Sequence, residues 1–184
     1  MTTALILHAA PAAGFDEPFE LLAACHQRVE RMLALLQRLP PHLQALGADR
    51  AAAAAARDVL RYFDLAAPHH HEDEERHVLP VLQASADAAL QALAVRLAAD
   101  HRAMTAAWAG LRPGLAQLTD GHWPVAGAVA GAAAQFSLWA AFDALYRDHL
   151  AAEEGTAYPA VSKRLAPPAL TAMGDEMARR RGAR

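Results

Sequence analysis

Two segments of this chain carry the same motif. Each begins with a histidine, continues with glutamates four and five residues later, and reaches an apolar residue at nine and a proline at ten. The copies are His70–Pro80 and His149–Pro159, and a Phe-Asp pair begins seven residues before each of them. Residues four apart lie one turn apart on the same face of an α-helix. The repeat therefore predicts two helices, each with a His–Glu pair on one face, which could meet at one point.

Apolar residues recur at three- and four-residue steps in four long segments, a spacing typical of amphipathic helices. The alanine-rich composition favours helix as well. The pattern predicts an all-α chain folded as an antiparallel up-down four-helix bundle, with a short C-terminal helix at 169–180. We expect a single domain over 1–184, with a bundle core at about 17–165 and a tail at 166–184. The first helix is expected from Pro18 to Pro40-Pro41, and the second from a cap at Asp49 to Pro80, with a kink at Pro68. The third is expected from a cap at Ser85 to Arg112-Pro113-Gly114, and the fourth from Pro124 to Pro159.

Composition and charge exclude several classes of protein. The formal net charge is −3 with neutral histidines, so the chain lacks the broad basic surface of a nucleic-acid-binding protein. The basic run Arg179–Arg181 is interpreted as a solvated tail. Cys25 is the single cysteine and is expected in the core, so no intrachain disulfide can form. Met1–Gly14 lacks a positively charged start, and no segment is typical of a membrane span. A cytoplasmic protein is expected.

Each expected helix has one histidine in its apolar row, and the second and fourth helices add a glutamate. The histidines are separated by 44 residues in the first pair of helices and by 48 in the second. Burying four imidazoles and two carboxylates is costly unless a metal compensates them. Six ligands exceed what a tetrahedral zinc ion accepts, but they suit two metal ions, and imidazole with carboxylate fits iron. The candidate ligands are His26, His70, Glu74, His101, His149 and Glu153.

The pattern resembles the hemerythrin family, in the bacterial hemerythrin-like branch known as the HHE cation-binding domain, over Phe19 to Leu165. The resemblance implies two iron ions in a non-haem, oxo- or hydroxo-bridged di-iron centre that binds dioxygen, with the same six residues as ligands. Oxygen-carrying members have a further histidine where this chain has Thr105, and an aspartate on the last helix instead of Glu153. These departures predict a more open or more reactive iron and argue against oxygen transport.

Other histidines and glutamates lie close to the motifs. His71 and Glu75 are also four residues apart, but the residue that matches His71 in the second copy is Leu150. His71 is therefore expected beside the metal or at the surface. His77 shares a face with His70 and is left open as a further ligand, although its counterpart is Thr156. A solvated position is expected for Glu30, Glu72, Asp73, Glu75 and Glu154, and a surface or loop position for His8, His42, His69 and His122.

Three functions are compatible with this pattern. The first is a binding protein that binds or senses dioxygen, nitric oxide or iron itself. The second is a di-iron oxidase or peroxidase-type enzyme, or an iron-handling protein. Ferritin-like enzymes need Glu-x-x-His on two helices, whereas here it occurs once, at Glu74–His77. The third is a structural bundle with adventitious metal. The expected partner is a small diatomic molecule, without nucleic acid or membrane, and a homodimer remains open.

Overall fold

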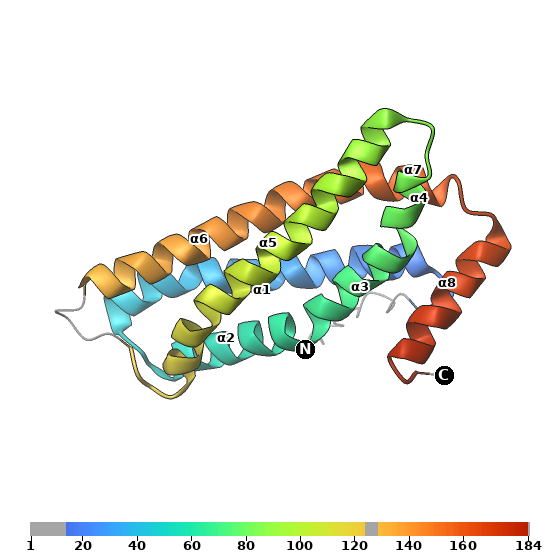
Figure 1. Cartoon of the computed structure of the whole chain (residues 1–184). Coiled ribbons are helices and arrows are strands. Elements are labelled where there is room, and N and C mark those ends of the chain that lie inside the picture. The colour runs from blue at the N-terminus through green and yellow to red at the C-terminus, as the bar shows by residue number, and fades with distance from the viewer. Residues whose placement is uncertain (1–13, 124–128, 184) are drawn as a thin grey trace, which may run out of the picture.

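A computed structural model describes residues 14–123 and 129–183 and is helical over most of them (Figure 1). These residues contain no strand, which agrees with the all-α prediction. Within them, no helix is both long enough and apolar enough to cross a membrane. The elements are α1 (Pro18–Leu46), α2 (Arg50–Arg61), the π-helical turn η1 (Tyr62–Ala66), α3 (Ala67–His77), α4 (Leu79–Gln83), α5 (Ala88–Thr119), α6 (Val129–Ala152), the π-helical turn η2 (Glu153–Ala157), α7 (Tyr158–Ser162) and α8 (Pro167–Arg180).

Helices α1 and α5 each pack against both α2 and α6, and α3 continues the line of α2 beside α1 (Figure 1). Buried apolar residues form two clusters along these helices. One contains Val29, Phe63 and Met104, and the other contains Leu22 and Leu97. In each long helical segment, the histidine predicted to bind metal falls between residues of the first cluster and residues of the second. The predicted site therefore has apolar packing on both sides.

Proline ends fewer helices than the sequence predicts. Helix α1 continues through Pro40 and Pro41, and α5 continues through Pro113. A proline inside a helix costs about 3 kcal/mol. The apolar face continues beyond the prolines in both helices, with Leu43 buried in α1 and Leu115 in α5. Burying a leucine contributes about 1.5–3 kcal/mol, so side-chain packing offsets the lost backbone hydrogen bonds.

The kink predicted at Pro68 takes the form of a π-helical turn. The backbone N–H of Ala67 donates to the Tyr62 carbonyl, five residues back. A second such turn, η2, precedes Pro159, and there the Tyr158 N–H donates to the Glu153 carbonyl. Single π-helical turns insert an extra residue into a helix and are frequent at functional sites. Both turns lie one helical turn or less from the predicted ligands.

Two helix starts test the predicted caps. The Asp49 side chain accepts a hydrogen bond from the Ala52 N–H, which confirms it as the cap of α2. The cap predicted at Ser85 is wrong, because α5 is capped by Asp87, whose side chain accepts from the Ala89 N–H. The start of the fourth helix near Pro124 lies outside the described residues, which resume at Val129 within α6.

Helix α8 docks at the end of the molecule where α1 begins (Figure 1). Arg180 and Arg181 both form ion pairs with Asp73, which is fully buried. The predictions of a solvated position are therefore wrong for Arg180, Arg181 and Asp73, whereas Arg179 is exposed, as predicted. They failed because nothing in the local sequence links charges that are more than 100 residues apart. A Cβ atom at Gly174 would lie 1.8 Å from the Phe15 carbonyl oxygen, so only glycine permits this close approach.

The docking of α8 is expected to weaken in acid. A hydrogen bond from Arg180 lowers the pKa of Glu176 to about 2, and the contact with His77 acts in the same direction. Because the pKa in the folded state is depressed, this stabilisation is present above the unfolded pKa and is lost as the pH falls towards 2. In urea titrations near neutral pH, the free energy of unfolding of Glu176→Gln should therefore be lower than that of the wild type. The difference should shrink between about pH 5 and about pH 2, and a constant difference would contradict this assignment.

Candidate metal centre

The structure brings all six predicted ligands together in the buried interior. Their side chains form two groups that could each hold a cation, with one ligand atom per residue and all of these atoms within 4.8 Å of one another. Each of the six residues is at most 2% exposed. The groups are His26, His70, Glu74 and Glu153, and Glu74, His101, His149 and Glu153. Both glutamates belong to both groups.

The Glu74 carboxylate spans the two groups. Its Oε1 atom lies 3.3 Å from His70 Nε2 and 3.7 Å from His26 Nε2. Its Oε2 atom lies 3.4 Å from His101 Nε2, which belongs to the other group. Each ligand group therefore has one oxygen atom of this carboxylate close to its histidines.

Glu153 repeats this arrangement from η2. Its Oε2 atom lies 3.2 Å from His26 Nε2, and its Oε1 atom lies 3.0 Å from His149 Nε2. The two carboxylates thus lie between two pairs of imidazoles, with every Nε2 atom facing inward. Carboxylates that offer one oxygen to each side can bridge two adjacent cations.

The outward nitrogens of two histidines are held by glutamates that the sequence analysis predicted to be solvated. The Nδ1 atom of His26 lies 2.8 Å from Glu154 Oε1, and that of His101 lies 3.0 Å from Glu75 Oε1. Both carboxylates are about half exposed, yet each accepts a hydrogen bond from a buried ring. A signal was present in the sequence, because each glutamate stands five residues after the motif histidine in its own copy. The prediction of a solvated face is therefore incomplete for these two residues.

A third histidine is oriented in the same way, since His149 Nδ1 lies 3.4 Å from Asp100 Oδ2. Three of the four rings therefore donate Nδ1–H to a carboxylate, so the Nε2 atom is the one that faces inward and can offer a lone pair once it has no proton. Metal-binding histidines generally have this kind of outer partner, because it fixes the tautomer and strengthens the ligand.

The donor set fits a cation because several of its atoms are buried without a partner. Both ring nitrogens of His70, Glu74 Oε2 and both carboxylate oxygens of Glu153 lack a hydrogen bond among the described residues. Unpaired buried carboxylates and imidazoles carry a large desolvation cost. Coordination of a metal ion by the inward-facing atoms would remove most of this cost.

The electrostatics of the site also favour positive charge. Burial lowers the pKa of His26, but the carboxylates of Glu153 and Glu74 close to its Nε2 atom outweigh this effect and raise the pKa to about 10. His101 shows the same balance, and its pKa is raised by Glu74. Burial raises the pKa of the Glu74 carboxyl, but the surrounding histidines, His70 first, bring it well below its usual value. Without a metal, protons on the histidines compensate the carboxylates, and metal binding displaces such protons.

Tyr158 is part of the site, although the sequence analysis treated it only as an apolar residue of the motif. Its hydroxyl donates to Glu74 Oε1 and lies 2.9 Å from His26 Nε2. Its ring stacks on the His26 imidazole at 5.1 Å between centroids. Burial, together with Glu74 and Glu153, holds the pKa of this phenol well above its ordinary value.

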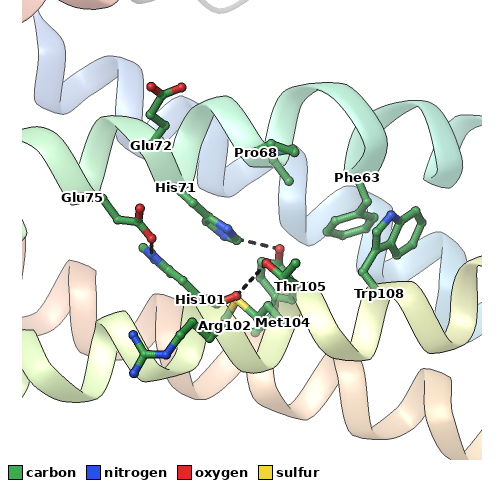
Figure 2. A pocket seen from close by; sticks show the side chains of 12 residues that line it. Phe63, Pro68, His71, Glu72, Glu75, His101, Arg102, Met104, Thr105 and Trp108 are labelled. Carbon is green, nitrogen blue, oxygen red and sulfur yellow. Dashed lines mark hydrogen bonds and ion pairs between the residues drawn. The ribbon is translucent and has the colours of Figure 1, made fainter.

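A pocket of about 430 Å³ opens beside His101 (Figure 2). We call it the His71 pocket, and its lining includes Phe63, His71, His101, Thr105, Trp108 and Tyr146. The His71 ring stacks on His101 at 4.2 Å, and burial lowers its pKa well below the ordinary value. Thr105 stands where oxygen carriers have a histidine, and its hydroxyl donates to the His101 carbonyl. In Figure 2 the dashed line from Thr105 of α5 ends on the His101 carbonyl, and the line from His71 of α3 marks its 3.4 Å contact with the Tyr146 hydroxyl.

The remaining candidates lie apart from the two groups. His77 Nε2 lies 2.8 Å from Glu176 of α8, and Glu72 pairs with Arg76. His42 pairs with Asp49. The residues Glu30, His69 and His122 are exposed, as predicted, and His8 lies outside the described residues.

Comparison with known proteins identifies the family. The family description "Hemerythrin HHE cation binding domain" matches residues 17–166, which is most of the chain. The chain is also 40% identical, over 77 residues, to an uncharacterized protein of Haemophilus influenzae. That match spans 42% of this chain and 45% of the relative. Two buried His/Glu groups and the match over residues 17–166 agree with each other, and the chain belongs to the hemerythrin HHE cation-binding family.

Proposed function

We propose that the protein binds two iron ions in the core of a single antiparallel up-down four-helix bundle. His26 and His70 would hold one ion, His101 and His149 the other, and Glu74 and Glu153 both. The observation that carries this proposal is that each carboxylate has one oxygen beside each pair of histidines. A reduced iron pair supplies electrons that dioxygen or nitric oxide can accept on binding. The protein would therefore bind or sense a small diatomic molecule, or iron itself.

The residues around the second pair of histidines favour sensing over transport. Thr105 offers a hydroxyl where an oxygen carrier has a histidine, and that hydroxyl is engaged with the His101 carbonyl. The His71 pocket reaches the ring of His101 from outside. This combination supports a site with a free position for an incoming ligand, reached from the α3–α5 side.

The proposal is tested by the optical response of the iron-loaded protein. The aerobic protein should show near-ultraviolet absorption that is lost on anaerobic reduction and returns on exposure to dioxygen. The reduced protein should also give a new spectrum with nitric oxide. Iron-loaded protein whose spectrum is indifferent to both gases after reduction would contradict a binding or sensing role.

A di-iron oxidase or peroxidase-type enzyme is the alternative, and one observation favours it. At about 430 Å³, the His71 pocket is larger than a diatomic molecule requires, and it has apolar walls at Phe63 and Trp108. Turnover of peroxide or of ferrous iron well above a control with the same amount of free iron would move the assignment to an enzyme. Turnover equal to that control leaves the binding protein as the better description.

A further inference from the structure

The two halves of the site differ at one position of the repeated motif. Nine residues after the motif histidine, the second copy has Tyr158 and the first has Leu79. Leu79 packs in an apolar cluster. The Tyr158 hydroxyl instead lies inside the half of the site that contains His26 and His70, in contact with two of the proposed ligands. The two copies of the motif therefore supply the same histidine and glutamate, but only the second copy adds a phenol oxygen.

The π-helical turn η2 accounts for the position of Tyr158. In a regular α-helix, residues five apart point roughly 140° away from one another, at about 100° per residue. In η2 the Tyr158 N–H donates to the Glu153 carbonyl, so the helix closes over five residues there. This wider turn brings the two side chains to the same side of the helix. At the equivalent point of the first copy, the Val78 N–H donates to Glu74 over four residues, as in an ordinary α-helix.

Three oxygen atoms surround the inward nitrogen of His26. Tyr158 Oη lies 2.9 Å from His26 Nε2, Glu153 Oε2 lies 3.2 Å from it and Glu74 Oε1 lies 3.7 Å from it. The phenol has a single proton, and it donates that proton to Glu74. The outward nitrogen of His26 is already taken by Glu154. Once a cation displaces the protons on His26 and Tyr158, the space between these atoms is lined by donors of electron pairs, which is what a bound cation requires.

Building on the proposed function, we propose that Tyr158 is itself an iron ligand, bound through its hydroxyl oxygen to the ion held by His26 and His70. A ferric ion would replace the phenol proton, which leaves to solvent, and no electron is transferred in this step. The other ion, held by His101 and His149, has no tyrosine counterpart and lies on the side of the His71 pocket. Tyr158 therefore makes the two ions chemically different and leaves the pocket-side ion to meet an external ligand.

Phenolate bound to ferric iron gives a charge-transfer band in the visible region and strong resonance Raman bands of the tyrosine ring. The chain has three tyrosines, so the band can be assigned by substitution. Iron-loaded, oxidised wild type is compared with Tyr158→Phe, Tyr62→Phe and Tyr146→Phe. Tyr146 is a matched buried control, because its hydroxyl faces His71 and not a proposed ligand. With band intensity normalised to the iron that each variant holds, we expect the bands in the wild type and both controls, and their complete loss in Tyr158→Phe.

The doubly substituted chain Tyr62→Phe/Tyr146→Phe covers the case in which Tyr158→Phe does not fold or does not hold iron. It retains Tyr158 as its sole tyrosine and should keep both the bands and the iron. Loss of the bands from this chain, or their persistence in Tyr158→Phe, would overturn the assignment. Two irons per wild-type chain without tyrosine bands would overturn it while leaving the proposed function intact. A wild type that binds no iron overturns both.

Discussion

Glu74→Ala is expected to abolish binding of both iron ions, whereas Glu75→Ala is expected to retain them. Glu74 is fully buried and belongs to both ligand groups, with one oxygen beside His70 and the other beside His101. Removing it would take one ligand from each of the two proposed ions at once. It also leaves neighbouring imidazoles without the carboxylate that balances their charge. We therefore expect less than a tenth of the wild-type iron after purification from iron-supplemented cells.

Glu75 is the matched control because it is the next residue and has the same charge. Its carboxylate accepts from His101 Nδ1 but contacts no other proposed ligand. Losing an outer partner of this kind typically weakens metal affinity by about 10–100-fold. Iron should therefore still bind, but a chelator should remove it faster than from the wild type. Equal iron content in Glu74→Ala and Glu75→Ala would contradict the assignment of Glu74 as a shared ligand.

Asp73→Ala is expected to destabilise the iron-free protein by about 3–5 kcal/mol, which is typical when one partner of a buried ion pair is removed. Asp73 is fully buried and holds both Arg180 and Arg181 of the C-terminal segment. Without it, Arg181 loses its only carboxylate partner among the described residues. Urea titration measures the effect as a change in the free energy of unfolding. The dependence of this free energy on urea concentration should be the same in both proteins if both unfold in two states.

Asp58→Ala provides the comparison for this change, because its carboxylate is exposed and pairs with Arg61 on the same helix, α2. Ion pairs of this kind contribute little to stability, so its unfolding midpoint should stay close to that of the wild type. Hydrogen exchange should show which part of the protein responds in Asp73→Ala, with faster exchange in α8 first. Equal stability of the two variants would contradict a stabilising role for the buried ion pairs of Asp73 with Arg180 and Arg181.

The repeated motif made His70, Glu74, His149 and Glu153 predictable, and the apolar rows of the other two helices added His26 and His101. Glu74 and Glu153 could be selected from a dense acidic stretch because two copies of one pattern align only in one register. The helical class could also be predicted, since the spacing of apolar residues reports on local geometry. The exposed neighbours Glu75 and Glu154 carried the same signal, but a carboxylate beside a buried histidine looks in sequence like any solvated charge.

Contacts between distant parts of the chain could not be predicted. The continuation of α1 through Pro40 depends on burial in the folded core, which outweighs a local preference. The pairing of Asp73 with Arg180 joins residues 107 apart in sequence. The role of Tyr158 depends on the π-helical turn η2, whose wider spacing departs from the regular helix that the sequence argument assumed.

The central claim is a pair of iron ions that share Glu74 and Glu153. It is tested most directly by measuring iron per chain and electron paramagnetic resonance on the same oxidised sample. Two ferric ions that share bridging ligands couple their spins, so the account predicts two irons per chain with no signal from isolated ferric iron. One iron per chain, or two irons that give the full signal of uncoupled ferric ions, would contradict it.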